Sequence, residues 1–178
     1  NGVRWVVRKN GVPPGQVSIR IRVDAGSLNE QESERGYAHL LEHLLFRQSK
    51  YLGDARAIPT WQRLGASFGN DTNAETTPTQ TVYKLDLPRT DAETVDTSLM
   101  LMREAAGELT LSQAAVDRER GVVLSEERAR DTPPYRVYVQ RLDFLLKGQK
   151  PPLRLPIGKV DVLNTAPASQ IADYYHRY

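Results

Sequence analysis

Two of the three histidines in the chain stand four positions apart, in the segment His39-Leu40-Leu41-Glu42-His43. Residues four apart on an α-helix share a face, so both imidazoles can point at one ion. Glu42 follows His39 by three positions and lies on nearly the same face, where its carboxylate can reach a metal-bound water without being a ligand. Zinc lowers the pKa of such a water to about 7, and the carboxylate can take its proton as the water attacks a carbonyl. The spacing therefore predicts a metal site for hydrolysis.

The same spacing is also compatible with a polar stripe on a helix surface. Against that, the two histidines flank apolar residues typical of a buried helix face, namely Leu41, Leu44 and Leu45. The order of the residues is the reverse of the common zincin order and matches the inverted motif His-x-x-Glu-His. We interpret His176 as an ordinary surface histidine.

A catalytic zinc site needs a third protein ligand and an open position. The chain contains no Cys, so that ligand should be a carboxylate from another element. Glu119 and Glu126 are seven positions apart, two helical turns, and share a face, whereas Glu127 is displaced from Glu126 by about 100°. A solvated, charged helix face would explain the same residues, and their spacing alone leaves the choice between Glu119 and Glu126 open.

The chain has the composition of an ordinary globular protein, and its length of 178 residues suits one domain. Lys and Arg number 24 and Asp and Glu 22, which argues against a dedicated nucleic-acid-binding protein. The absence of Cys excludes disulfides and thiolate chemistry. The longest apolar run, residues 99–102, is far too short to span a bilayer. We therefore expect no nucleic-acid partner and no membrane span.

The strands that must position the motif are indicated by alternation of apolar and polar residues. Residues 16–24 and 81–87 alternate with a period of two, as antiparallel strands with one wet face do. Residues 5–8 read as a further strand, which Asn10-Gly11 would turn into a hairpin. Residues 69–78, rich in Gly, Asn, Asp and Thr, are either a loop or a short irregular edge strand.

Helical periodicity and end signals predict helices over residues 34–49, 57–68, 90–107, 112–130 and 135–147, and a last one from about residue 168. Thr90 with Glu93 has the pattern of a capping box, and Ser112 can cap the following helix. Strands paired by hairpins, with helices between them, indicate an α+β fold in which helices pack on one face of an antiparallel sheet.

Nearly the whole chain resembles the amino-terminal domain of the pitrilysin/insulinase metallopeptidases, which include the mitochondrial processing peptidase. Within this family it resembles the bacterial periplasmic members most. The central motif with its flanks is highly specific, whereas the other matching segments would be weak alone. The matching segments are residues 23–27, Gly36 to Phe46, Asn73 to Thr76, residues 81–83, Glu119 to Glu126, and residues 156–159.

This resemblance implies one Zn²⁺ held by His39, His43 and Glu126, with Glu42 as the general base. Glu119 would be a further carboxylate that orients a ligand. Glu126 follows His43 by 83 positions, somewhat more than is usual in the family, whereas Glu119 follows it by 76, close to the familiar separation. We expect Glu126 to be the ligand because the pair of glutamates seven apart matches the local pattern, and Glu119 is the fallback.

The resemblance also implies that Asn73, Ala74, Glu75 and Thr76 form an edge strand with which an extended peptide or unfolded protein pairs. A plain polar loop is the alternative. Family members pair this domain with a homologous second domain or subunit, which contributes an Arg and a Tyr. We expect residues 1–178 to be a single metallopeptidase amino-terminal domain, incomplete at its C-terminal end and weakly active or inactive in isolation.

Three functions compete on these grounds. The first is a zinc endopeptidase. The second is a non-catalytic partner subunit of a processing peptidase, acting in assembly or substrate capture, although such subunits typically lose the ligands. The third is an interaction domain with a structural metal, which the open-site pattern disfavours. The lack of Cys and the resemblance favour a periplasmic location, with the cytoplasm as the alternative.

Overall fold

The computed structural model describes residues 2–178 and contains one antiparallel sheet of three strands. The strands are β1 (Val17–Val23), β2 (Thr72–Thr76) and β3 (Thr81–Leu87), in the spatial order β1-β3-β2. In the register, Ile21 of β1 and Ala74 of β2 both lie opposite Tyr83 of the central strand. Both β1 and β2 are therefore edge strands.

Alternation along β3 divides the sheet into a dry and a wet face. The buried residues of β3 alternate with half-buried ones, and the buried set includes Tyr83, Leu85 and Leu87. On the wet face Arg20 pairs with Asp86 at 2.9 Å. The expected α+β architecture, with helices on one face of an antiparallel sheet, is confirmed.

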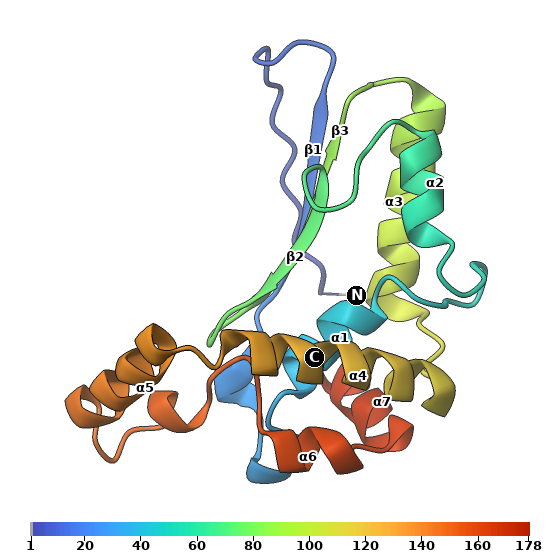
Figure 1. Ribbon diagram of the computed structural model, residues 1–178. Helices are drawn as coiled ribbons and strands as arrows, with labels where there is room; N and C mark the ends of the chain where they lie inside the picture. The colour runs from blue at the N-terminus through green and yellow to red at the C-terminus, as the bar shows by residue number, and fades with distance from the viewer. Residues whose placement is uncertain (1) are drawn as a thin grey trace.

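Two helices cover the dry face along the upper part of the sheet (Figure 1). These are α2 (Ala57–Arg63) and α3 (Ala92–Gly107). Trp61 of α2 and Leu101 of α3 are buried in one cluster with Leu85 and Leu87 of β3.

The second cluster of buried side chains joins four helices at the lower end of the sheet (Figure 1). They are α1 (Tyr37–Leu44), α4 (Gln113–Arg130), α6 (Val160–Thr165) and α7 (Ala168–Arg177). Leu40 and Leu44 of α1 pack here with Val116 and Val123 of α4. Helix α5 (Pro133–Leu145) extends from the end of α4 away from this cluster (Figure 1).

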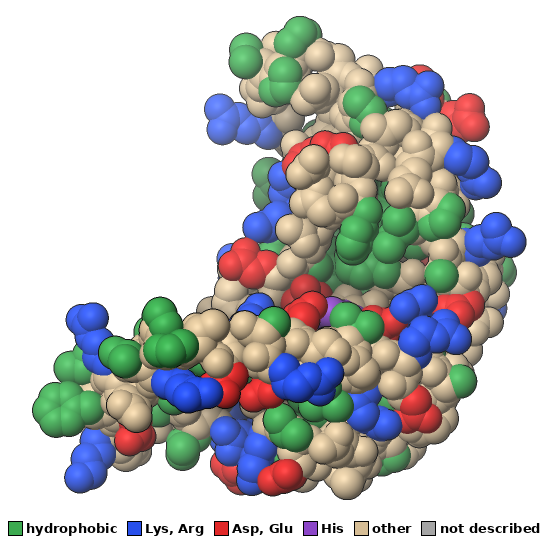
Figure 2. Space-filling model, viewed as in Figure 1, with side chains coloured by type: hydrophobic (Ala, Val, Ile, Leu, Met, Phe, Trp, Pro, Cys, Tyr) green, Lys and Arg blue, Asp and Glu red, His purple; other side chains and the backbone are tan. Residues whose placement is uncertain are grey.

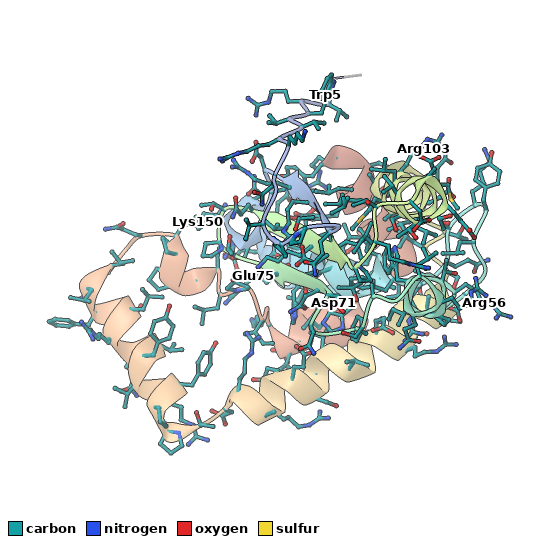
Figure 3. All side chains as sticks on the ribbon, turned by 90° about the horizontal axis from the view of Figure 1, so that it is seen from above. Trp5, Arg56, Asp71, Glu75, Arg103 and Lys150 are labelled. Atoms are coloured by element: carbon teal, nitrogen blue, oxygen red, sulfur yellow. The ribbon has the colours of Figure 1, made fainter. Side chains whose placement is uncertain are left out.

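The predicted strand at residues 5–8 and its hairpin are wrong. Residues 2–11 have no regular secondary structure, and Trp5 is 80% exposed and projects away from the helices (Figure 3). Pro13 and Pro14 provide no amide hydrogen for a ladder and lengthen the turn beyond the two residues of a tight hairpin.

The helix predicted over residues 34–49 is shorter, because Gly36 has a φ of 103°, which an α-helix does not accommodate. At its other end the chain turns away, and the Lys50 N–H donates to the Glu108 C=O at 2.9 Å. The second helix ends early at Arg63, ahead of Gly65, whose φ is 91°.

The remaining helix ends agree only in part with the predictions. Ser112 caps α4 as predicted, whereas Asp91 rather than Thr90 caps α3 by accepting the Thr94 N–H. Pro133 and Pro134 begin α5 as well as following α4, since the first turn of a helix needs no amide donors. Helix α6 was not predicted.

Candidate metal centre

The two motif histidines lie on successive turns of α1, on the side that faces α4. The N-terminus of this short helix is fixed by the buried carboxylate of Glu30, which accepts hydrogen bonds from the N–H groups of Gly36 and Ala38, each at 3.0 Å. Carboxylates at this end of a helix satisfy amides that lack partners within the helix. The helix therefore starts at a defined place, and the direction of both imidazoles follows from it.

Four atoms of three side chains converge beside α1. The Nε2 atoms of His39 and His43 are 3.3 Å apart, and the two rings are nearly perpendicular, at 86°. Glu126 of α4 places Oε2 at 3.4 Å from His39 Nε2 and Oε1 at 3.6 Å from His43 Nε2. Tetrahedral zinc with bonds of about 2.0–2.2 Å requires its ligand atoms to lie about 3.3–3.6 Å apart. The separations and the mixture of nitrogen and oxygen donors fit a zinc ion.

His39 is held in the form that a metal requires. Its side chain is 8% exposed, and burial, with smaller contributions from the charges of His43 and Arg130, lowers the pKa of His39 to about 3. The ring is thus neutral at pH 7, with a lone pair to offer. Its Nδ1 has no hydrogen-bond partner among residues 2–178.

Glu42 belongs to the same cluster, since its carboxylate and the two imidazoles offer ligand atoms within 4.8 Å of one another. The Thr76 hydroxyl donates a 2.5 Å hydrogen bond to Glu42 Oε2. Burial raises the pKa of Glu42, and although the hydrogen bonds of Thr76 and the charge of His43 oppose it, the net shift is upward. A carboxyl with a raised pKa is suited to general base chemistry near neutral pH.

Glu119 lies on the other side of the His43 ring from Glu126. Its Oε2 is 3.4 Å from His43 Nδ1, and its Oε1 accepts a 2.6 Å hydrogen bond from Arg47 Nε. Burial raises the pKa of Glu119, but the bonds to His43 and Arg47 outweigh it and leave the pKa below its ordinary value. Burial likewise lowers the pKa of His43, and the bond to Glu119 with the nearby carboxylates makes the net shift upward.

The edge strand next to the cluster directs some of its backbone groups outward. The Asp86 N–H donates to the Asp71 C=O, so odd-numbered residues of β2 bond to β3 and even-numbered ones face outward. Thr72 uses its outward groups within its own loop, bonding to residues 67 and 69. Ala74 and Thr76 also face outward, but the Ala74 N–H donates to Asn73 Oδ1 at 2.9 Å and the Thr76 backbone is hydrogen-bonded to Glu42, so an added strand would have to replace these bonds.

A cavity of about 470 Å³ opens beside the cluster. The space-filling view shows a hollow above α4, with histidine and carboxylate atoms at its base and apolar side chains above them (Figure 2). The lining combines charged residues of the cluster, residues of β2 and apolar side chains, the last being Phe46, Ala55, Ile58, Phe68, Ala74 and Val122.

The structure brings His39, Glu42, His43, Glu119 and Glu126 together, whereas His176 is exposed on α7 and packs against Tyr175. Asn73 and Ala74 line the cavity, while Glu75 pairs with Lys84 at 3.1 Å. Sequence reasoning missed Arg47, Phe46 and Phe68. Phe46 lies within the motif's flank, but nothing local in the sequence indicates what Arg47 or Phe68 contacts.

The sequence of residues 5–144 matches the family model of the insulinase peptidases, peptidase family M16. The chain belongs to this family. Over 178 residues it is 35% identical to "Probable zinc protease PqqL" of Haemophilus influenzae, covering all of this chain and 19% of that protein. The crystal structure of the first half of the periplasmic protease PqqL from Escherichia coli has a TM-score of 0.89 at 33% identity, over 93% of this chain and 36% of that one.

A more distant M16 relative is the beta subunit of the mitochondrial-processing peptidase of Rattus norvegicus, 27% identical over 179 residues, which cover 98% of this chain and 34% of that subunit. The chain thus spans about a fifth of the length of PqqL and a third of that subunit. The relatives are named for different compartments, periplasm and mitochondrion. Within residues 2–178, every helix is too short or too polar to cross a lipid bilayer.

Proposed function

We propose that this M16 domain is the catalytic domain of a zinc-dependent endopeptidase. The observation that supports it most is the convergence of His39 Nε2, His43 Nε2 and the Glu126 carboxylate at separations of 3.3–3.6 Å. These three side chains would hold one zinc ion and leave a coordination position open. When bound, zinc supplies a Lewis acid that acidifies water and polarises a peptide carbonyl.

Glu42 is the general base in this proposal. The Thr76 hydroxyl donates to Oε2 of its carboxylate, which restricts the rotation of that group. Oε1 takes a proton from the attacking water, and the protonated carboxyl then delivers it to the leaving amine. The raised pKa of Glu42 brings its proton affinity closer to those of the attacking water and the leaving amine, with which it would exchange a proton.

The peptide would lie along β2. Its backbone would pair with the outward-facing groups of Ala74 and Thr76, replacing the bond of the Ala74 N–H to Asn73 Oδ1. Such pairing selects for an extended chain rather than for particular side chains. The neighbouring cavity of about 470 Å³ has apolar walls at Phe46, Ile58 and Phe68. We therefore propose that one large apolar or aromatic side chain next to the cleaved bond enters this cavity.

A homologous second domain or subunit would enclose the peptide, and the fragment alone would cleave weakly or not at all. The similarity to PqqL supports a periplasmic location for the whole protein. The non-catalytic alternative is less well supported, because His39, Glu42 and His43 are all present and lie in one cluster.

The test combines metal analysis with peptide cleavage by the full-length protein. Wild type should contain about one zinc per domain, and Glu42→Gln should retain that zinc while losing cleavage by roughly a hundredfold or more. Cleavage that persists in Glu42→Gln would refute the base. Strong destabilisation on chelation, without any cleavage by wild type, would instead indicate a structural metal.

A further inference from the structure

Arg47 lies three positions after the last residue of α1, and its side chain reaches across to α4. Its backbone N–H donates to the Leu44 C=O at 3.0 Å, which fixes the turn at the end of the helix. Its side chain donates from Nε to Glu119 Oε1 at 2.6 Å, and Nη2 contacts the same oxygen. The Arg47 side chain is 24% exposed and that of Glu119 only 6%. The pair is therefore largely removed from water.

The two oxygens of Glu119 have different partners. Oε1 is taken by Arg47, whereas Oε2 lies 3.4 Å from Nδ1 of His43. The opposite nitrogen of that ring, Nε2, faces His39 and Glu126. Arg47, Glu119 and His43 thus form a chain of contacts that ends at the nitrogen directed toward the candidate metal.

We propose that Arg47 is a positioning residue for the metal centre, which fixes the Glu119 carboxylate so that Glu119 in turn orients the His43 imidazole. The inference rests on the proposed function, since it concerns the same centre. A buried carboxylate without a cation is costly, and a guanidinium both balances its charge and restricts its rotation. The partner of the outer ring nitrogen determines how a histidine presents its other nitrogen to a metal.

Arg118, another arginine near Glu119, pairs with a different carboxylate. Arg118 is next to Glu119 in the sequence, but its guanidinium pairs with Asp54 at 2.7 Å and is 52% exposed. Arg118 therefore provides a matched control: an arginine beside Glu119 whose ion pair lies outside the cluster. Arg47 also lines the cavity, so direct contact with substrate is the competing role.

The experiment measures zinc affinity without substrate, by competition with a chelator, in the full-length protein. Arg47→Met should weaken zinc binding by about tenfold, at the low end of the loss seen when a partner of a metal ligand is removed. Arg47→Lys keeps the charge, so its zinc affinity should lie between those of wild type and Arg47→Met. Arg118→Met should bind zinc as wild type does.

A double-mutant cycle tests whether Arg47 acts through Glu119. In a Glu119→Gln background, Arg47→Met should cause no further loss of zinc affinity. If Arg47→Met does not fold, the same cycle is measured with Arg47→Lys. An undiminished loss in the Glu119→Gln background, or wild-type affinity in Arg47→Met, would overturn the inference.

The cycle also separates this inference from the proposed function. A protein that binds zinc normally in every Arg47 variant contradicts the inference and leaves the peptidase proposal intact. A wild-type protein that binds no zinc overturns both. Loss of peptide affinity with unchanged zinc affinity would assign Arg47 to the substrate and refute the positioning role.

Discussion

The Thr76 hydroxyl donates a 2.5 Å hydrogen bond to Glu42 Oε2, although the two residues are 34 positions apart. The bond joins the edge strand β2 to helix α1 at the point where the peptide and the proton-accepting carboxylate would meet. Backbone pairing and proton transfer would thus be connected through one side chain, which makes Thr76 a direct test of the proposed mechanism.

Replacing Thr76 by Val keeps the shape and removes this hydrogen bond. The bond to a charged group contributes about 1.5 kcal/mol, so we expect peptide cleavage to fall about tenfold while zinc content is unchanged. Because Thr76 lowers the pKa of Glu42, its removal should move the acidic limb of the pH–rate profile to higher pH. Thr79→Val, in the exposed turn after β2, is the control. An unshifted acidic limb would contradict the role given to Thr76.

The ligand assignment predicts different effects for two adjacent glutamates of α4. Glu126→Gln should weaken zinc binding by more than about a hundredfold, beyond the usual loss from an outer partner, because it removes a charged ligand. Glu127→Gln removes the same charge from a position turned by about 100° around the helix and should leave the affinity unchanged. Equal affinities for the two variants, measured by chelator competition, would show that Glu126 is not a ligand.

The approach of Gly158 to Gly36 predicts a strong effect on stability. A Cβ on Gly158 would lie 2.5 Å from the Gly36 Cα, and the φ of Gly158 is 86°. Gly158→Ala should therefore cost more than about 2 kcal/mol of unfolding free energy. Gly148 has a similar φ of 77° but open space around it, so Gly148→Ala should cost only about 1 kcal/mol. Urea unfolding of both variants checks this, and similar losses would mean that strain in φ alone matters.

Glu30 predicts a particular pH dependence of stability. Burial raises its pKa to about 7 in the folded protein, above the ordinary 4.5, despite the opposing hydrogen bonds at the start of α1. A group with a raised folded pKa stabilises the fold fully below pH 4.5 and loses this contribution as pH rises through 7. The slope reaches at most about 1.4 kcal/mol per pH unit.

Urea unfolding of the metal-free protein at several pH values tests this against Glu30→Gln. The variant offers one acceptor oxygen where Glu30 has two, so it should be less stable throughout. Its stability should nevertheless vary less with pH between 4.5 and 7, and the gap between the two proteins should narrow across that range. Parallel curves would show that Glu30 does not titrate there.

Much of the site was predictable from local spacing. Positions four apart place His39 and His43 on one side of α1, and positions seven apart place Glu119 and Glu126 on one side of α4. These relationships depend only on the helix repeat. The central strand and the cap at Ser112 were also predictable, since alternation and capping act over a few residues.

The remaining features depend on contacts between distant segments. The Arg47–Glu119 pair spans 72 positions, and no local pattern indicates it. The start of α1 depends on the conformation of Gly36, against which Gly158 packs. Such outcomes are decided by tertiary packing, which overrides local preference.

The contact between Gly36 and Gly158 has a consequence for how the chain can be divided. Every candidate ligand lies before residue 127, so a deletion after α4 would seem harmless to zinc binding. Yet Leu163 of α6 packs against Gly36, and the Lys159 N–H donates to the Arg35 C=O. The smallest autonomous unit that would bind the ion therefore extends at least to α6, more than thirty residues past the last residue that would touch the metal.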